Sequence, residues 1–431
     1  MEQAVPIRPH DHDHDYDHSR PFDVWKAGEA PQIGEAVSYL FEELKPHFGH
    51  NINKKPGRYK QAIKKVVLDL YVAWLSDPHL FVAYSRNRND YSMGRRYSKL
   101  HINYNAMIDV IDILHELGYI HHKTGFHDRS RGIGRQSRMI ATPKLIRLIE
   151  SKRINKHMIH HQREEIELRN SAKKPIDYID TSKTIRWRLN VQQINGVLLG
   201  ADISMELTSP EKEELVKRIG YLPDDTNKTL FRVFNNGSFK QGGRFYGHWI
   251  QNIPREYRKR LRMDGEETVE LDFAGVHINI LYRLAGQAIP RDDVYALDGF
   301  APAIRPFLKR ALLIMVNAKD RGQAVRAIQA EPITGELRFK RGDIERAMDG
   351  FIQRHRPIER FFNSGIGLDL QFADSRIAEH VMLELAGCNI VCVPLGDGFI
   401  CKVAFENELR EAMQAAFRDM FGVSIGIDRE Y

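Results

Sequence analysis

The sequence predicts a mixed α+β protein, with a helical N-terminal part followed by a part that combines helices with short strands. Between residues 22 and 80, apolar side chains recur at intervals of three and four residues, the period of an amphipathic helix. Short β-rich runs stand at residues 269–271 and on both sides of Gly396. At 431 residues and 42% hydrophobic side chains, the chain is long enough for two or three domains with cores of their own.

Composition narrows the class of protein. Charged residues make up 28% of the chain, and the longest apolar runs, such as residues 311–316, are far shorter than the roughly 20 residues of a membrane-spanning helix. The N-terminus carries histidines and acids where a signal peptide has an apolar core, so we expect a cytoplasmic protein without a membrane partner. The formal charge of +7 suits a partner rich in phosphate. Three cysteines without a CxxC pair predict neither a disulfide framework nor a cysteine zinc site.

Four segments are predicted along the chain. Residues 1–21, with alternating histidines and aspartates, are expected to be a disordered, solvated tail. Residues 22–150 are expected to form a helical and winged-helix domain that binds nucleic acid. Residues 151–190 are dense in both charge signs, which predicts a charged linker or an exposed helix. Residues 191–431 are expected to form the remaining domain, with two helical patterns near its start at 190–220.

A winged-helix pattern occupies residues 104–150. A helix that ends at Gly118 is followed by a strand at 119–123, a basic turn, a second strand at 137–141 and a further helix. This order is similar to that of the winged helices of replication initiators and transcription regulators. In such a module the first helix would be the candidate for the major groove of DNA. The wing arginines would contact phosphates, and these are Arg129, Arg131, Arg135 and Arg138. The alternative is a module that only docks onto another domain.

Residues 242–282 combine a basic, aromatic segment with an acid at the end of an apolar strand. The extended pattern at 269–271 ends at Asp272, and small residues and a helix-compatible run at 276–284 follow. An acid at the end of a strand can hold a metal ion in a cleft. The segment therefore predicts a catalytic core that acts on nucleic acid.

In order and spacing, this stretch resembles a block of the family A DNA polymerases, to which the single-subunit phage RNA polymerases are related. The family's block runs from a TGR-type segment through QNIP to the palm carboxylate. The matching parts of this chain are GGRFYGHWIQNIP (residues 242–254), the arginine-rich segment after it and VELDFAGVHINIL (residues 269–281). The resemblance implies a right-hand fold of palm, fingers and reduced thumb. It also implies two Mg²⁺ ions, or Mn²⁺, held by two palm aspartates, of which Asp272 is the first. Contacts to nucleic acid would come from Arg244, Gln251 and Asn252.

Residues 301–330 match the fingers of that family. Arg305 and Lys309, four residues apart, lie on one stripe of a helix whose other stripe is apolar. In the family's fingers helix an arginine and a lysine at this spacing hold the incoming nucleoside triphosphate, and Tyr-Gly follows after seven residues. By this resemblance Arg305 and Lys309 bind the nucleotide, Asn317 stands at the tyrosine position, and His277 stands where DNA-synthesising members have a sugar-excluding glutamate.

Two further motifs follow in the family's order. Gln371 precedes an amphipathic helix, as in the family's segment that touches the minor groove of the primer-template. Gly396 and Gly398 enclose Asp397 between two β-rich runs, so a hairpin would present this acid at its tip. Since Asp397 follows Asp272 by 125 residues (397 − 272), only the fold can bring the two acids together, as neighbouring palm strands would.

The sequence departs from the family around Asp397. The family has His-Asp-Glu or His-Asp-Ser there, and the glycines of this chain remove a side chain expected to contact the primer end, which would slow catalysis. No pattern of paired acids typical of a proofreading exonuclease precedes the core. The replacements at His277 and Asn317 leave the choice between deoxyribonucleotides and ribonucleotides open.

These observations predict a minimal DNA polymerase that extends a DNA primer-template with nucleoside triphosphates, in the replication of a plasmid or phage-like element. The nearer alternative is an RNA polymerase or primase-like enzyme of the same fold, with RNA as product or partner. A second alternative is a DNA-binding replication or regulatory factor whose palm is inactive.

Overall fold

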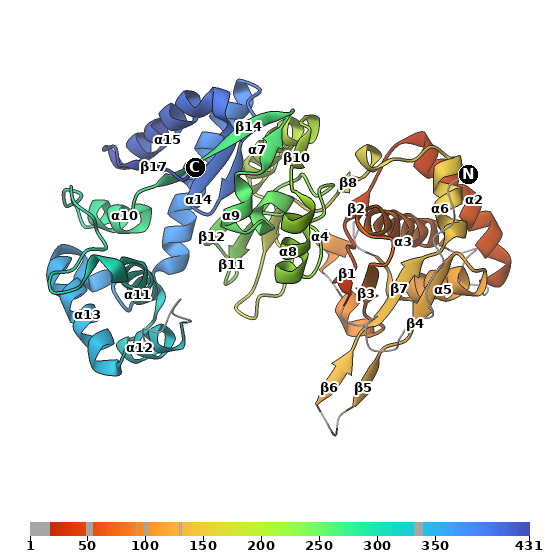
Figure 1. Ribbon diagram of the computed structural model, residues 1–431, viewed down its shortest axis with the longest axis horizontal. Helices are drawn as coiled ribbons and strands as arrows, with labels where there is room; N and C mark the ends of the chain where they lie inside the picture. Colours follow the sequence, from red (N-terminus) through yellow and green to blue (C-terminus); the bar gives the residue numbers. More distant parts are fainter. Residues whose placement is uncertain are drawn as a thin grey trace.

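The structure, a computed structural model, describes residues 18–48, 55–92, 94–98, 102–128, 130, 132–331 and 339–431 of the chain. The fold is mixed α+β, as the sequence predicts, and it forms two bodies that lie side by side (Figure 1). Most of the predicted disordered tail, residues 1–17, lies outside the described residues. For its last three residues the prediction is wrong, because Ser19–Pro21 forms strand β1.

The first body is a four-stranded sheet covered by helices. Strand β1 pairs in parallel with β3, β7 follows as a central antiparallel strand, and β4 completes the sheet. Helix α3 is buried along most of its length and contacts α2, α5 and α6. The strands and helices of this body are β2 (Lys26–Ala27), α2 (Pro31–Leu44), α3 (Pro56–Ser76), β3 (Phe81–Tyr84), α5 (Tyr104–Glu116), β4 (Ile120–Lys123), β7 (Ser137–Ala141) and α6 (Pro143–Ser151). The short helix α4 (Arg95–Ser98) lies between β3 and α5 in the chain and is hydrogen-bonded to residues 168–180 of the second body.

The elements expected of the winged helix are all present in this body. Helix α5, strands β4 and β7, and helix α6 lie within two residues of the predicted bounds. Between β4 and β7 a hairpin of β5 (Phe126–Asp128) and β6 (Ile133–Arg135) projects away from the sheet (Figure 1). Asn103 caps α5 by accepting a hydrogen bond from the backbone of Ala106, which accounts for the start of this helix.

The second body contains two sheets. Strand order β12–β11–β9 defines the smaller sheet, and order β10–β13–β14–β16–β15 defines the larger one, in which β17 also pairs with β14. The larger sheet is antiparallel throughout. Its strands and those of the smaller sheet are β9 (Ile166–Leu168), β10 (Ile203–Met205), β11 (Phe231–Asn235), β12 (Ser238–Tyr246), β13 (Leu261–Met263), β14 (Glu266–Phe273), β15 (Val393–Leu395), β16 (Gly398–Lys402) and β17 (Ile427–Arg429).

Helices surround these two sheets. The longest, α14, packs against β12, α7, α15 and α10, so it connects the small sheet to the large one. Helices α11, α12 and α13 pack on one another and form the end of the body farthest from the N-terminal half (Figure 1). The helices are α7 (Ser182–Gly200), α8 (Ser209–Ile219), α9 (Arg255–Arg258), α10 (Val276–Leu284), α11 (Arg305–Asn317), α12 (Arg321–Ala330), α13 (Arg341–Arg354), α14 (Gly367–Gly387) and α15 (Glu406–Phe421).

Each body has its own hydrophobic core. One core extends over residues 33–159 and the other over residues 166–425. The segment 151–190, expected to be a charged linker or a helix, contains instead β8 (His160–His161) and β9 before α7 begins. Its charged residues are interrupted by the buried Ile166–Leu168, which pairs in parallel with β11. No helix within the described part of the chain is long and apolar enough to cross a membrane.

Candidate active site

Two carboxylates far apart in the sequence meet at the end of strand β14. Asp272 pairs directly with Gly398 of β16, and Asp397 precedes Gly398 in the two-residue turn that joins β15 to β16. Gly396, the other residue of this turn, has a φ of 68°, which glycine adopts without strain. The hairpin turn therefore holds Asp397 beside Asp272, next to the residue that pairs with it.

The environment of Asp272 suits a cation. Burial, and then the charge of Asp397, raise the pKa of Asp272 to about 7, although the nearby Lys309 lowers it. Oδ1 of Asp272 is buried and has no hydrogen-bond partner among the described residues. A buried carboxylate oxygen without a partner is unfavourable, and oxygen ligands are those that Mg²⁺ prefers. Asp272 and Asp397 therefore fit a divalent metal ion.

Gly398 lies where the carboxylate of Asp272 leaves no room for a side chain. A Cβ at this position would lie 2.9 Å from Oδ1 of Asp272 and 2.9 Å from the carbonyl oxygen of Leu271. Real Cβ atoms do not approach other atoms so closely. The carbonyl oxygen of Leu271 is fixed in the backbone of β14, so the carboxylate of Asp272 would have to give way. The glycine after Asp397 thus lets the carboxylate of Asp272 lie against the turn.

A cavity of about 1060 Å³ opens beside Asp272. Its lining combines five acids with five cations. The acids are Asp272, Asp292, Asp293, Asp428 and Glu430, and the cations are Arg255, Arg283, Arg291, Arg305 and Lys309. Arg305 is bound to Asp293, with Nε 2.6 Å from Oδ2 and Nη2 3.0 Å from Oδ1. Lys309 is exposed, forms no ion pair with another described residue and lies 5.4 Å from the ring centre of Tyr295. Lys309 is therefore available to an anionic ligand, as is the exposed Arg291, which also forms no ion pair with another described residue.

Arg244 and His277 are both bound by the buried Asp374 of α14. Nε of Arg244 lies 3.1 Å from each carboxylate oxygen, and Nε2 of His277 lies 2.8 Å from Oδ2. We expected Arg244 to contact a nucleic acid strand and His277 to contact the nucleotide. The structure places both in an internal ion-pair network next to the acid pair, with the side chain of Arg244 23% exposed.

The remaining predicted residues of this body are dispersed around the site. Nδ2 of Asn317 donates to the carbonyl oxygen of Leu313 at the exposed end of α11, 2.7 Å away. Nε2 of Gln251 donates to the carbonyl oxygens of Phe245 and Pro394, at 3.0 and 2.9 Å, and so ties β12 to β15. The amide nitrogen of Gln251 is thus occupied by the backbone rather than directed at a ligand.

Asn252 is more exposed than Gln251, and Gln371 is buried to a similar extent as Gln251. Asn252 is exposed at the end of the short 3₁₀ helix Trp249–Asn252 and lines a cavity of about 550 Å³ together with Arg244 and Gly396. Gln371 is half-buried in α14, a few residues before Asp374. A contact between either residue and nucleic acid stays a prediction.

Of the four wing arginines, the structure describes Arg135 and Arg138. Arg131, like Arg129, lies outside the described residues, and Arg135 is in β6 opposite Phe126. Arg138 is only 1% exposed, with its guanidinium 5.4 Å from the ring centre of Phe81. The expectation for Arg138 is wrong, because β7 is a central strand whose side chains are covered.

Helix α5 is poorly suited to the major groove of DNA. Its exposed side chains include Asp112 and Glu116, and Asp112 binds Arg86 through both oxygens, at 2.7 and 2.8 Å. Arg86 already balances the charge of Asp112, but α5 itself carries no arginine or lysine that could contact phosphates. The charge of this face therefore favours the alternative in which the winged helix serves another contact.

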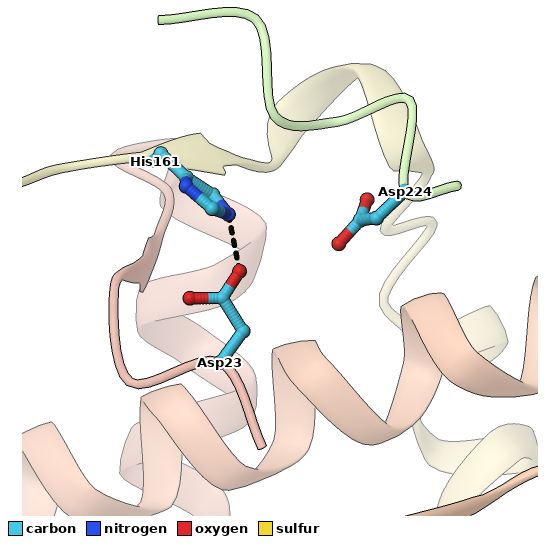
Figure 2. A group of neighbouring side chains, drawn as sticks. All are labelled: Asp23, His161 and Asp224. Carbon is cyan, nitrogen blue, oxygen red and sulfur yellow. Dashed lines mark ion pairs between the residues drawn. The ribbon is translucent and has the colours of Figure 1, made fainter. Parts of the chain in front are cut away.

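A second group of candidate metal ligands joins the two bodies. One ligand atom each from Asp23, His161 and Asp224 lies within 4.8 Å of the others (Figure 2). The fully buried Lys26 forms ion pairs with Asp224 and with Asp23, the latter at 3.6 Å. A lysine ammonium thus already balances both carboxylates, and we assign this group to an ion-pair network rather than to a metal centre.

Three residues near the acid pair were not singled out from the sequence. Asn279 is 5% exposed, lines the large cavity, and its Oδ1 has no hydrogen-bond partner among the described residues. The buried Tyr295 has a raised pKa, because of burial and of the charges of Asp397 and Asp272. Asp374 lies in a long amphipathic helix. A polar residue on the buried stripe of a predicted helix is the signal that would have indicated Asn279 and Asp374.

Comparison with known proteins does not assign the chain to a family. No protein-family model matches the chain, and no curated protein sequence matches it. Among solved structures the chain is similar to the polymerase domain of Pol1 from M. smegmatis in complex with DNA primer-template and dNTP. The similarity has a TM-score of 0.34 and 11% sequence identity, and it covers 52% of this chain and 57% of that one. A likeness of this size does not establish a family.

Proposed function

We propose that this protein is a metal-dependent nucleotidyltransferase that extends a nucleic acid strand on a template, with DNA as the first candidate for both. The observation that carries the proposal is the pair Asp272 and Asp397, which the antiparallel strands β14 and β16 hold side by side with one carboxylate oxygen buried and unpartnered. Two carboxylates arranged in this way suit divalent metal ions. When bound, such ions stabilise the charges of the attacking and leaving oxygens.

The cavity beside the acids supports a nucleoside triphosphate as the substrate. A triphosphate requires positive charge next to the metal site, and Lys309, Arg305 and three further arginines line the same cavity as Asp272. Lys309 is close enough to Asp272 to lower the pKa of that carboxyl. We therefore assign Lys309 to the triphosphate, Arg305 to a supporting position held by Asp293, and Asp272 and Asp397 to the metal ions.

The alternative of an inactive palm rested on the glycines that flank Asp397. Gly398 is accounted for by the carboxylate of Asp272, which occupies the space of a side chain, and Gly396 by the positive φ of a tight turn. Both glycines thus help to place the acid pair. They favour an intact site over a degenerate one.

Incorporation of labelled nucleotides tests the proposal. The full chain is incubated with Mg²⁺ and either dNTPs or NTPs, on primed and on unprimed single-stranded DNA, and the products are sized. Extension of a primer with dNTPs supports the DNA polymerase, whereas products made from NTPs without a primer support the RNA polymerase or primase alternative. The absence of any product with Mg²⁺ and with Mn²⁺, from protein shown to be folded, contradicts nucleotidyl transfer.

A further inference from the structure

Four exposed cationic side chains gather where helix α7, strand β12 and helix α14 meet. Helix α14 packs against both β12 and α7, so residues distant in the sequence share one surface. The four residues, hereafter the α7–α14 patch, are Lys183 and Arg186 in α7, Lys240 in β12 and Arg376 in α14.

The α7–α14 patch is not neutralised. None of its four side chains forms an ion pair with another residue of the described ranges, whereas Arg188 and Arg232 close by are bound to Glu164 and Glu379. Burial and then the charges of Arg376, Arg186 and Lys240 lower the pKa of Lys183. The four side chains are thus near enough to repel one another. Uncompensated like charges destabilise a fold unless a ligand of opposite charge binds them.

Lys183 is held in place by aromatic rings. Its Nζ lies 4.8 Å from the ring centre of Trp187 and 5.6 Å from that of Phe372. Such contacts orient an ammonium group without neutralising it. The patch therefore presents at least one positioned cation, which distinguishes it from scattered surface lysines.

The patch also lies on a route that leads to the acid pair. Lys240 and Arg244 belong to the same strand, β12, on either side of a bulge at Gly242 and Gly243. In α14 the exposed Arg376 stands two residues after the buried Asp374, which binds Arg244 and His277 near Asp397. The same strand and helix therefore carry both Lys240 and Arg376 of the patch and the residues next to the acid pair.

We propose that the α7–α14 patch binds the phosphate backbone of the nucleic acid duplex that leaves the acid pair. The assignment of a duplex rests on the proposed function, because a strand copied from a template leaves paired with it. Positive charge from two helices and a strand is spread over enough width to contact several phosphates. Contacts to phosphates carry no sequence information, so this surface grips any duplex equally.

A salt titration of binding tests this inference. In the full chain, Lys183, Arg186, Lys240 and Arg376 are replaced together by glutamine, and the affinity for a fluorescent DNA duplex is measured between 50 and 200 mM salt without nucleotide or metal. Four lost contacts at about 0.9 each reduce the slope of log affinity against log salt by about three to four. A matched variant removes the same charge from four other exposed cations that form no ion pair with another described residue, and it should leave the slope nearly unchanged. These cations are Lys212, Lys217, Arg326 and Arg356.

The outcomes separate this inference from the proposed function. A reduced slope for the patch variant alone supports the patch even if the protein incorporates no nucleotide. An unchanged slope, or an equal loss in both variants, overturns it. A patch variant that loses affinity for single-stranded DNA but not for the duplex also overturns it, because the bound partner is then a single strand. Circular dichroism spectra that match the unaltered protein exclude unfolding as the cause.

Discussion

Gly398 lies directly opposite Asp272 in the antiparallel pair of β14 and β16, and the carboxylate of Asp272 fills the space where a side chain on Gly398 would begin. Through this contact the hairpin turn affects the position of the Asp272 carboxylate. The turn brings Asp397 close, and the missing side chain lets Asp272 remain in its rotamer. The geometry of the acid pair therefore depends on a residue that has no functional group of its own.

Substitution of Gly398 by alanine should reduce nucleotide transfer more than it reduces stability. The added methyl group would meet Oδ1 of Asp272 at 2.9 Å, so the carboxylate has to move. Overpacking of this kind costs about 1–3 kcal/mol, whereas a displaced metal ligand should lower the rate by about a hundredfold. The rate of incorporation and the thermal midpoint are compared with those of Gly387→Ala, where a Cβ meets nothing within 4 Å. Equal rates for the two variants would contradict this account of the turn.

Replacement of Asp272 or Asp397 by asparagine should abolish synthesis without loss of folding. Each change removes a negative charge that holds a metal ion, and a reduction of about a thousandfold corresponds to about 4 kcal/mol of the activation barrier. DNA affinity should stay close to that of the unaltered protein, because the acids face the metals rather than the duplex. Asp298→Asn, an exposed acid in a loop, serves as the control. If Asp272→Asn or Asp397→Asn extends a primer at the normal rate, the assignment of these two acids to metal ions is wrong.

Loss of Lys309 should impair the binding and transfer of the nucleotide, whereas loss of its neighbour Arg310 should not. Lys309 faces the cavity that Asp272 lines, while Arg310 points elsewhere on α11 and binds Glu331 at 2.9 Å. Truncation of Lys309 to alanine should raise the apparent KM for the nucleotide and lower kcat, together by about tenfold or more in kcat/KM. Steady-state titrations of nucleotide at fixed template give both constants. If Arg310→Ala shows the same loss, a general charge effect and not a specific contact is responsible.

The sequence predicts those parts of the site that neighbours along the chain determine. The apolar run that ends at Asp272 became β14, and the Gly-Asp-Gly turn became the hairpin that presents Asp397, because strand pattern and turn residues are local signals. The partner of Arg244 is different. Asp374 lies 130 residues away and reaches Arg244 only because α14 packs on β12, which no local pattern encodes.

Arg138 shows a second limit of the sequence. In SRMIA a single arginine precedes three apolar residues, a pattern that is as consistent with an exposed wing as with a covered central strand. The order of strands places β7 between β3 and β4, so the strand is central and Arg138 is covered. The same holds for α5, whose acids are visible in the sequence, but whose exposed face is known only once α3 covers the other.

The junction between the two bodies should be sensitive to acid through Asp224. Burial alone would raise the pKa of this carboxyl, but the charges of Lys26, Arg20 and His161 outweigh burial and lower it to about 2. Its ordinary value is 3.8, so the unfolded chain takes up this proton at a higher pH than the folded chain does. The stabilisation from ionised Asp224, about 2 kcal/mol, is therefore fully present above about pH 5 and is lost as the pH falls toward 2.

A comparison of Asp224→Asn with Asp225→Asn measures this contribution. The first change leaves the buried Lys26 without a main partner and should cost about 3 kcal/mol at pH 7, whereas the second removes only an exposed contact with Lys156 at 2.7 Å and should cost less than about 1 kcal/mol. Thermal midpoints recorded from pH 7 to pH 2.5 should draw closer for Asp224→Asn and the unaltered protein as the pH falls, because protonation increasingly removes the same charge. Parallel curves over this range would show that Asp224 titrates at its ordinary pKa, and that the network with Lys26 does not hold the two bodies together.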